Sequence, residues 1–173
     1  MKRKLFLILY YGIFKHLPDT GGGRMLVFRH MRAWCCRHIF ASAGKNINIE
    51  GGADFGIGNQ IRIGDNSGIG IDCKLRGPVT IGNDVLMGPE VIIFTNGHNH
   101  EYTDIPIRLQ GTTESKEVRI GNDVWIGQRV IIMPGVTIGD GCIIGAGAIV
   151  TRNIPAYTVA AGIPAKVVKH RRK

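Results

Sequence analysis

A six-residue rhythm of aliphatic side chains constrains this chain more than any other feature of its sequence. Steps of six from residue 57 to residue 93, and again from residue 120 to residue 150, meet an aliphatic residue every time. The positions are Ile57, Ile63, Ile69, Leu75, Ile81, Met87 and Ile93, then Ile120, Ile126, Ile132, Ile138, Ile144 and Val150. A glycine usually follows each of them, and another small or branched apolar residue usually lies four places after it.

A period of six matches neither the 3.6-residue period of an α-helix nor one long half-buried strand. It matches short strands that each end at a corner, with one apolar side chain pointing inward per side and Gly or Asn permitting the turn. Three such sides close a triangular coil of about 18 residues. The sequence therefore predicts an all-β solenoid of the β-helix class, in which stacked coils bury an aliphatic column.

The two runs of the repeat are out of register with each other. Ile93 and Ile120 are 27 residues apart, which is not a multiple of six. The interval contains the polar stretch NGHNHEYTDIPIRLQGTTESKE, so we expect an excursion loop over about residues 95–117 that leaves the solenoid at one corner. The solenoid interior is closed to polar side chains, whereas a loop can carry them. His98 and His100 in this loop are therefore the first candidates for chemistry.

Length and composition favour a single intracellular domain. A chain of 173 residues suffices for one domain with a core. Its four cysteines form neither a CxxC pair nor a secreted disulfide framework, which is typical of a reduced, cytoplasmic protein. We expect residues 1–43 to form an N-terminal helical segment, residues 44–169 to form the β-helix, and residues 170–173 to form a basic tail.

The formal net charge is +9, and basic residues cluster in MKRK at one end of the sequence and in KVVKHRRK at the other. Such a balance can suit nucleic acid, a membrane surface or an anionic small substrate. The sequence contains no recognition-helix, zinc-finger or RNA-binding aromatic pattern. We therefore do not expect a nucleic acid as a partner.

The stretch MKRKLFLILYYGIF joins basic residues to an apolar run that is shorter than the roughly 20 residues needed to span a bilayer. No small-residue cleavage site follows it. We expect a short helix that either packs on the end of the solenoid or lies on an anionic membrane surface. After a break at PDTGGG (18–23), residues 24–40 are predicted to form an amphipathic helix, with Phe28 and Cys35 on its apolar face and Arg32 on its polar face.

The repeats, the TNGHNH loop, the run VWIGQRVIIMPGVTIGDGCIIGAGAIVT and the closing AAGIPAKVV together resemble a known family. It is the family of hexapeptide-repeat acyltransferases, and the resemblance is closest to small sugar O-acetyltransferases of the galactoside, maltose and nodulation type. The resemblance covers about residues 44–169. It implies a left-handed parallel β-helix, a homotrimer with an active site in each cleft between subunits, and acetyl-CoA lying along that cleft. The left hand follows from the resemblance and not from the spacing.

The loop histidines acquire roles through the same resemblance. His98 matches the histidine that deprotonates the acceptor hydroxyl, which then attacks the thioester directly. A hydroxyl group is too weak an acid to react unaided, and an imidazole that titrates near neutrality is a suitable general base. His100 is the alternative, although it could instead orient the substrate or remain solvated. It stands where sugar-specific relatives often have proline, which leaves the identity of the acceptor open.

Further positions match sites that contact acetyl-CoA in the family. The resemblance implies that Trp125 lines the acetyl and pantetheine end of the cleft, that Gln128 lies along the pantetheine arm, and that Ala146 keeps space for that arm.

The resemblance also implies that Thr151 and Arg152 lie near the nucleotide end and that Lys166 and Lys169 lie near the phosphates, where cationic groups suit several negative charges. The family often has lysine in place of Arg152. Asp72 is the candidate for a contact with the acceptor.

The sequence thus predicts an acetyl-CoA-dependent O-acetyltransferase that acts on a sugar hydroxyl in capsular or surface polysaccharide biosynthesis. The alternatives are an acetyltransferase of another acceptor, antibiotic or serine-like, and a non-catalytic β-helix that only binds. A zinc enzyme usually needs three protein ligands, whereas the repeat region offers only two histidines, so no metal is expected. We expect a cytoplasmic protein, with a peripheral position at the inner membrane face as the finer alternative.

Overall fold

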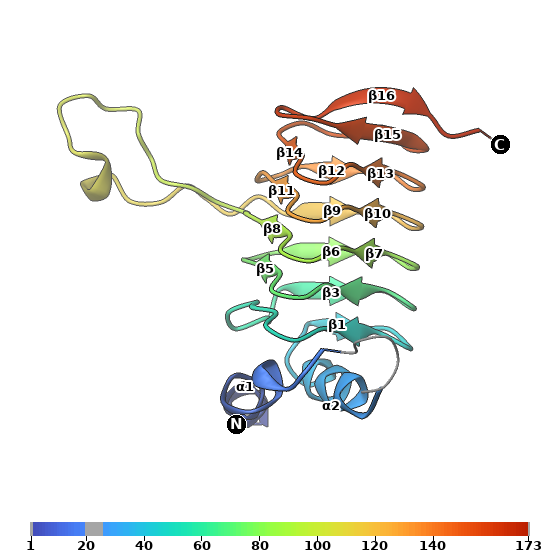
Figure 1. Cartoon of the computed structure of the whole chain (residues 1–173). Coiled ribbons are helices and arrows are strands. Elements are labelled where there is room, and N and C mark those ends of the chain that lie inside the picture. Colours follow the sequence, from blue (N-terminus) through green and yellow to red (C-terminus); the bar gives the residue numbers. More distant parts are fainter. Residues whose placement is uncertain (1, 20–25, 173) are drawn as a thin grey trace.

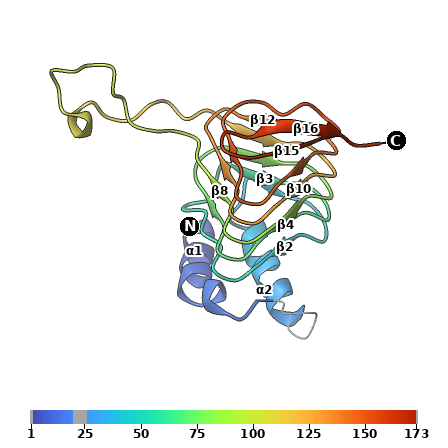
Figure 2. The ribbon, with the colours of Figure 1, turned by 45° about the horizontal axis from the view of Figure 1, so that its top comes forward.

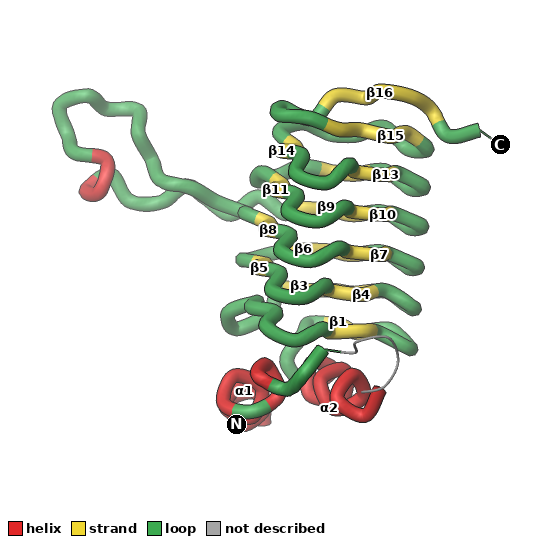
Figure 3. Tube along the Cα trace, viewed as in Figure 1, coloured by secondary structure: helices red, strands yellow, loops and turns green. Residues whose placement is uncertain are grey.

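The computed structural model describes residues 2–19 and 26–172. The chain winds into a three-sided prism of stacked coils, with two helices across one end and one long loop projecting from the side (Figure 1). The helical elements are α1 (Lys2–Gly12), η1 (Phe14–His16), α2 (Leu26–Arg37) and, within the loop, η3 (Ile107–Leu109). Figure 3 shows how short the strands are compared with the turns that join them.

Each side of the prism is a stack of short strands that run parallel, except for β16, and we call the sides faces 1, 2 and 3. Face 1 consists of β1 (Ser42–Ala43), β3 (Ile61–Ile63), β6 (Val79–Ile81), β9 (Val118–Ile120) and β12 (Thr137–Ile138). Face 2 consists of β2 (Asn48–Ile49), β4 (Gly68–Ile69), β7 (Leu86–Met87), β10 (Trp125–Ile126), β13 (Ile143–Ile144), β15 (Thr158–Ala161) and the antiparallel β16 (Lys166–His170). Face 3 consists of β5 (Lys74–Leu75), β8 (Ile92–Ile93), β11 (Ile131–Ile132) and β14 (Ile149–Val150).

The predicted aliphatic column is the core of the prism, with one exception. From Ile63 onward, every position of the six-residue rhythm is buried. Ile57 was expected in the column but is 64% exposed, so this part of the prediction is wrong. The bridge between Asp54 and Lys74 instead brings Phe55 into the column. The ring of Phe55 packs on Tyr10 of α1, with centroids 4.5 Å apart, and residues 56–60 bulge outward at the corner.

Polar side chains at the corner between faces 1 and 2 hold successive coils together. Asp65 Oδ1 accepts a hydrogen bond from the backbone N–H of Lys45 at 2.6 Å, and Asn83 Oδ1 accepts one from Asp65 at 2.7 Å. The same corner needs glycine, because a Cβ on Gly82 would lie 2.6 Å from the carbonyl oxygen of Gly121. The Gly-Asp and Gly-Asn pairs that follow the buried aliphatics therefore satisfy backbone groups while letting coils approach closely.

The helices cover the end of the prism where the first coil lies (Figure 1). Tyr10 of α1 is fully buried and donates a hydrogen bond to the carbonyl oxygen of Ala53 at 3.0 Å. This packing is one of the two arrangements that the sequence left open for the first helix. Within residues 2–19 and 26–172, no helix is long and apolar enough to cross a membrane.

Arg32 corrects the prediction for the second helix. The sequence pattern assigned it to the polar face of α2, yet its side chain is fully buried. Its Nε donates to the carbonyl oxygen of Ile49, and its Nη1 donates to those of Leu17 and Pro18 at 3.1 and 2.9 Å. The arginine is buried because it satisfies backbone carbonyls that the chain exposes where it turns beneath the first coil. The predicted break at 18–23 lies mostly outside the described residues.

The excursion loop, which we call the arm (residues 95–117), leaves the prism between β8 and β9. Leu75 pairs with Ile93, 18 positions on, whereas Ile93 pairs with Ile132, 39 positions on, so the coil that contains the arm is longer than the coil before it. Buried Thr95 anchors its base by donating to the carbonyl oxygen of Arg76 at 2.6 Å. Figures 1 and 2 show the arm extending far from the coils.

Candidate active site

An outward-facing apolar row runs up face 2. Leu86, Trp125, Ile143 and Val159 are register partners in successive strands, so their side chains stack above one another. Trp125 is 52% exposed, and Leu86 is more exposed still. At the upper end Val159 pairs with Lys169 of β16, so the apolar row ends beside a lysine. This arrangement places Trp125 and Lys169, two of the predicted contacts with acetyl-CoA, on one line.

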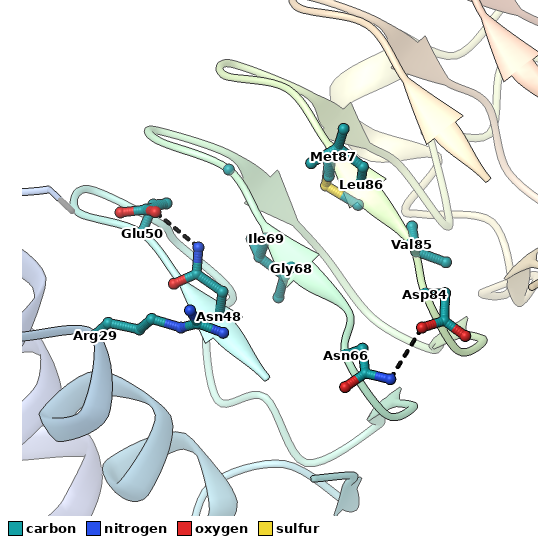
Figure 4. A pocket seen from close by; sticks show the side chains of 11 residues that line it. Arg29, Asn48, Glu50, Asn66, Gly68, Ile69, Asp84, Val85, Leu86 and Met87 are labelled. Carbon is teal, nitrogen blue, oxygen red and sulfur yellow. Dashed lines mark hydrogen bonds between the residues drawn. The ribbon is translucent and has the colours of Figure 1, made fainter. Parts of the chain in front are cut away.

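A polar cleft of about 470 Å³ lies at the lower end of this row, between α2 and strands β2, β4 and β7 (Figure 4). Gly68 occupies the position below Leu86 and has no side chain, which leaves the wall of the cleft open. The cleft is lined by Arg29, Asn48, Glu50, Asn66, Gly68, Ile69, Gly70, Asp84, Val85, Leu86 and Met87. Its lining therefore combines hydrogen-bonding side chains with a few apolar ones.

The polar groups of the cleft are held in pairs. Asn48 Nδ2 donates to Glu50 Oε1 at 2.7 Å, and Asn66 Nδ2 donates to Asp84 Oδ1 at 2.9 Å. Oδ1 of Asn48 is buried and has no hydrogen-bond partner among residues 2–19 and 26–172. In Figure 4, Arg29 reaches from α2 toward β2. A buried polar atom without a partner is costly.

Gln128 and Ala146 lie in neighbouring coils at the corner between faces 2 and 3. The carbonyl oxygen of Gln128 accepts a hydrogen bond from the backbone N–H of Gly147 at 2.8 Å, so the two turns are stacked. Ala146 is exposed. One coil below, Glu90 forms an ion pair with Arg129, and the hydrogen bond from Arg129 lowers the pKa of Glu90.

Asp72 lies at the same corner but opens toward face 3 instead of face 2. Its φ is 54°, in the left-handed region. It lines a second cleft of about 570 Å³, together with Lys15 and Asp54. Burial alone would raise the pKa of Asp54, but the N–H of Gly56 and the charges of Arg76 and Lys15 outweigh burial and lower it. The structure thus separates Asp72 from the row that contains Trp125.

The remaining predicted contacts occupy two other places. Thr151 and Arg152 follow β14 at the corner between faces 3 and 1, which is also the corner where the arm leaves, and both are exposed. Lys166 is exposed at the start of β16. Part of the predicted basic tail contacts the coils, because Arg171 pairs with Asp123 at 2.9 Å and donates to the carbonyl oxygen of Gly141.

Both candidate histidines lie on the arm and are exposed. His98 bridges antiparallel to Thr112, and its carbonyl oxygen is 3.0 Å from Nδ1 of His100. The arm leaves on the side of the prism away from β7 and β10 (Figures 1 and 2). One chain therefore does not bring His98 to Trp125.

Several residues that shape this region were not predicted from the sequence. Leu86, Ile143 and Val159 each stand one place before a buried residue, so their outward direction could have been derived from the two-residue alternation of a strand. The row could then have been found by aligning the coils across the arm. Gly68 stands before buried Ile69 in the same way, whereas the bulge at residues 56–60 places Asn48 20 positions before Gly68 instead of 18.

The chain is similar in sequence to known transferases. Residues 117–152 match the family described as bacterial transferase hexapeptide (six repeats). The chain is 42% identical over 137 residues to the galactoside O-acetyltransferase of Escherichia coli strain K12, covering 77% of this chain and 65% of that relative. It is 31% identical over 147 residues to a putative colanic acid biosynthesis acetyltransferase of the same strain, covering 84% and 78%.

Solved structures are similar over almost the whole chain. A maltose O-acetyltransferase from Clostridium difficile 630 matches with a TM-score of 0.80 and 33% identity, covering 99% of this chain and 87% of that one. A galactoside acetyltransferase in complex with coenzyme A matches with a TM-score of 0.77 and 35% identity, covering 98% and 80%. The family match confirms the expected left-handed β-helix. The chain spans just under two thirds of the length of the galactoside O-acetyltransferase found by sequence.

Proposed function

We propose that this chain, which belongs to the hexapeptide-repeat acetyltransferases, transfers an acetyl group from acetyl-CoA to a hydroxyl group of a sugar. The observation that carries the proposal is the outward row of face 2. The row joins a polar cleft below Trp125 to Lys169 above it. Such a surface offers three successive environments, which suit a hydroxylated acceptor, the acyl-carrying pantetheine chain of acetyl-CoA and its phosphates.

The row has the length and chemistry to hold the pantetheine chain of acetyl-CoA. Successive strands are about 4.8 Å apart, so the steps from Trp125 to Lys169 cover about 14 Å. Ile143 and Val159 provide apolar contact between these two ends. Gln128 and the small side chain of Ala146 border the pantetheine chain of acetyl-CoA at the adjoining corner. Lys169 and Lys166 pair with phosphate groups at the upper end.

The acceptor binds in the cleft beneath Trp125, where amide and carboxylate groups can accept and donate hydrogen bonds to sugar hydroxyls. His98 takes the proton from one hydroxyl while the oxygen of that hydroxyl attacks the thioester carbonyl carbon. The bond from carbon to sulfur breaks, the thiol of coenzyme A leaves with a proton, and the sugar holds the acetyl ester. Asp72 remains a proposed acceptor contact, reached from the second cleft across the corner.

The position of the arm supports a homotrimer with shared sites. The arm leaves its own prism on the side away from β10 (Figures 1 and 2), so a second chain has to provide either His98 or Trp125. Thr151 and Arg152 occupy the same corner as the base of the arm. A neighbouring chain would therefore contribute its arm and this Thr–Arg pair together, facing the row on face 2. Closed cyclic assemblies are the usual way in which identical chains repeat such a contact.

We place the enzyme in the cytoplasm, with a peripheral position at the inner membrane face, where lipid-linked sugars are available. The relative named for colanic acid biosynthesis supports a glycan precursor as acceptor. An acceptor of another class, antibiotic or serine-like, would fit the same chemistry with a different cleft. A solenoid that only binds would hold acetyl-CoA without turning it over.

The deciding experiment follows acetyl-CoA turnover as thiol release against a panel of sugars, including precursors of surface polysaccharides. His98→Ala is expected to lower the rate by roughly 10²–10⁴-fold, as loss of a general base does. His100→Ala, two residues away on the same arm, is the matched control and should stay close to the wild type. If the loss follows His100 instead, the base assignment is wrong. If the wild type binds acetyl-CoA but acetylates no acceptor, the catalytic proposal falls.

A further inference from the structure

The helices at the base of the prism carry an apolar surface that the fold does not use. One side of α1 packs inward through Tyr10, which is fully buried. On the opposite side, Leu5 is 64% exposed and Ile8 is 72% exposed. Residues three apart lie on the same side of a helix, so these two side chains form one outward ridge. A helix that is apolar on both sides is expected to have its second side covered by something.

An aromatic residue of α2 extends this ridge. Trp34 is about half exposed, and its ring packs edge-on against Phe6 at a centroid distance of 5.2 Å. Phe6 follows Leu5 directly in α1, so the indole lies beside the same end of the ridge. Tryptophan prefers the boundary between water and hydrocarbon, because its ring is apolar and its N–H group is a donor.

The charge around the ridge has one sign. Lys2, Arg3 and Lys4 are exposed in the first turn of α1, and Arg37 is exposed at the end of α2. Neither Lys2–Gly12 nor Leu26–Arg37 contains an acidic residue. A second copy of the chain meeting this surface face to face would bring these cations together. An apolar ridge rimmed by cations alone is instead complementary to a layer of anionic lipid headgroups.

We propose that the base of the prism, formed by Leu5, Ile8, Trp34 and the adjacent basic residues, docks on an anionic lipid surface. α1 has 11 residues and lies across the end of the prism, so it would rest in the interface without spanning the bilayer. The coils and the face-2 row would then rise from the membrane, with the polar cleft near the lipid. Docking of this surface on lipid does not depend on acetyl transfer.

The test uses the full chain and vesicles, without acetyl-CoA. Wild-type protein should sediment with vesicles that contain phosphatidylglycerol, should not sediment with pure phosphatidylcholine vesicles, and should be released by high salt. The double variant Leu5→Glu/Ile8→Glu should bind at least about ten-fold more weakly, because two apolar contacts are lost and two repelling charges are added. Val168→Glu is the matched control, since Val168 is 62% exposed at the opposite end of the prism.

Tryptophan fluorescence gives a second readout, because the chain contains only Trp34 and Trp125. In the Trp125→Phe variant, anionic vesicles should shift the emission of Trp34 to shorter wavelength. In the Trp34→Phe variant, they should leave the emission of Trp125 unchanged. Equal binding to both lipids, absence of binding, or a folded double variant that binds like the wild type would overturn the proposal. If the double variant instead changes the oligomeric mass in light scattering and the wild type ignores vesicles, the ridge is a contact between chains.

Discussion

Nη2 of Arg32 in α2 lies 3.5 Å from Oε2 of Glu50, which follows β2 in the first coil. The guanidinium group is fully buried, and its other nitrogen atoms donate to backbone carbonyls beneath the coil. Glu50 in turn accepts a hydrogen bond from Asn48 at the lower end of the polar cleft. One buried cation therefore joins the helical base to the first coil and to the floor of the candidate acceptor site.

We expect Arg32→Met to destabilise the protein by about 3–5 kcal/mol, because it removes the buried cation beside the Glu50 carboxylate and takes the Arg32 donors away from several backbone carbonyls. Urea unfolding followed by circular dichroism measures the change in the free energy of unfolding. Arg29→Met is the matched control on the same helix. Arg29 is only partly buried and bonds to Asn46, so its loss should cost less than about 1 kcal/mol. Equal costs for both variants would show that burial of Arg32 does not hold the base in place.

Gly82→Ala should destabilise the coils, because the new methyl group would lie 2.6 Å from the carbonyl oxygen and 2.7 Å from the carbonyl carbon of Gly121, which are backbone atoms. The coils would have to separate locally, at a cost of about 1–3 kcal/mol. Gly12→Ala in α1 is the control, since its added Cβ would have no heavy atom of the described residues within 4 Å, apart from its chain neighbours and the backbone of its own helix. That variant should be neutral or stabilising by up to about 1 kcal/mol, because alanine favours a helix. Thermal unfolding of the two variants side by side tests the prediction.

The repeat made most of the prism predictable, because each inward position is chosen by burial alone and burial leaves a trace at a fixed spacing. The misplaced Ile57 shows where that reasoning ends. The sequence keeps the rhythm at Ile57, but the aromatic side chains of Tyr10 and Phe40 pull Phe55 into the column. Such a long-range packing preference has no period. Arg32 was missed for a related reason, since its partners are backbone carbonyls that no pattern of side chains reveals.

The candidate site was predictable as a set of residues but not as an arrangement. The resemblance named Trp125, Gln128 and Ala146, and the structure distributes them over one face and the adjoining corner. The resemblance did not indicate that Leu86 and Val159 continue the row of Trp125. The arm interrupts the spacing between Leu86 and Trp125, and Val159 follows Ile143 by 16 positions instead of 18. The distance between His98 and Trp125 within one chain could not be inferred either, since the direction of a long loop depends on contacts beyond the repeat.

Ala146→Phe should block the pantetheine arm. Ala146 is exposed at the corner beside the face-2 row, so a larger side chain can be accommodated by the fold but projects into the proposed path. We expect acetyl-CoA to bind at least about ten-fold more weakly, measured by titration calorimetry, because displaced contacts cost more than 1.4 kcal/mol. Ala156→Phe, at an exposed alanine of the corner between faces 1 and 2, is the control and should bind acetyl-CoA normally. Unchanged affinity in Ala146→Phe would remove this corner from the site.

Asp54 should make the protein more stable at neutral than at acidic pH. Its folded-state pKa is lowered, because the Gly56 N–H, Arg76 and Lys15 together outweigh the opposing effect of burial. The stabilisation is therefore complete above the ordinary aspartate pKa of about 3.9 and is lost as pH falls through the lowered value. In Asp54→Asn, the deficit in unfolding free energy relative to the wild type should be about 1 kcal/mol at pH 7 and should shrink toward pH 2. Asp104→Asn on the arm is the control, and a deficit in Asp54→Asn that stays constant with pH would contradict the assignment.

Mixed assemblies provide a test of whether the site is shared between chains. His98→Ala removes the arm group, and Ala146→Phe blocks the cleft, so each variant alone should be inactive. In a mixed trimer, a site that combines the intact arm of one chain with the intact face of another should work. Co-expression with two different tags, followed by purification through both, should restore about a third of the wild-type sites, because each mixed trimer contains one site with an intact arm and an intact cleft. If both groups act within one chain, every site keeps one lesion and the mixture stays inactive, because no chain in it carries both an intact arm and an intact cleft.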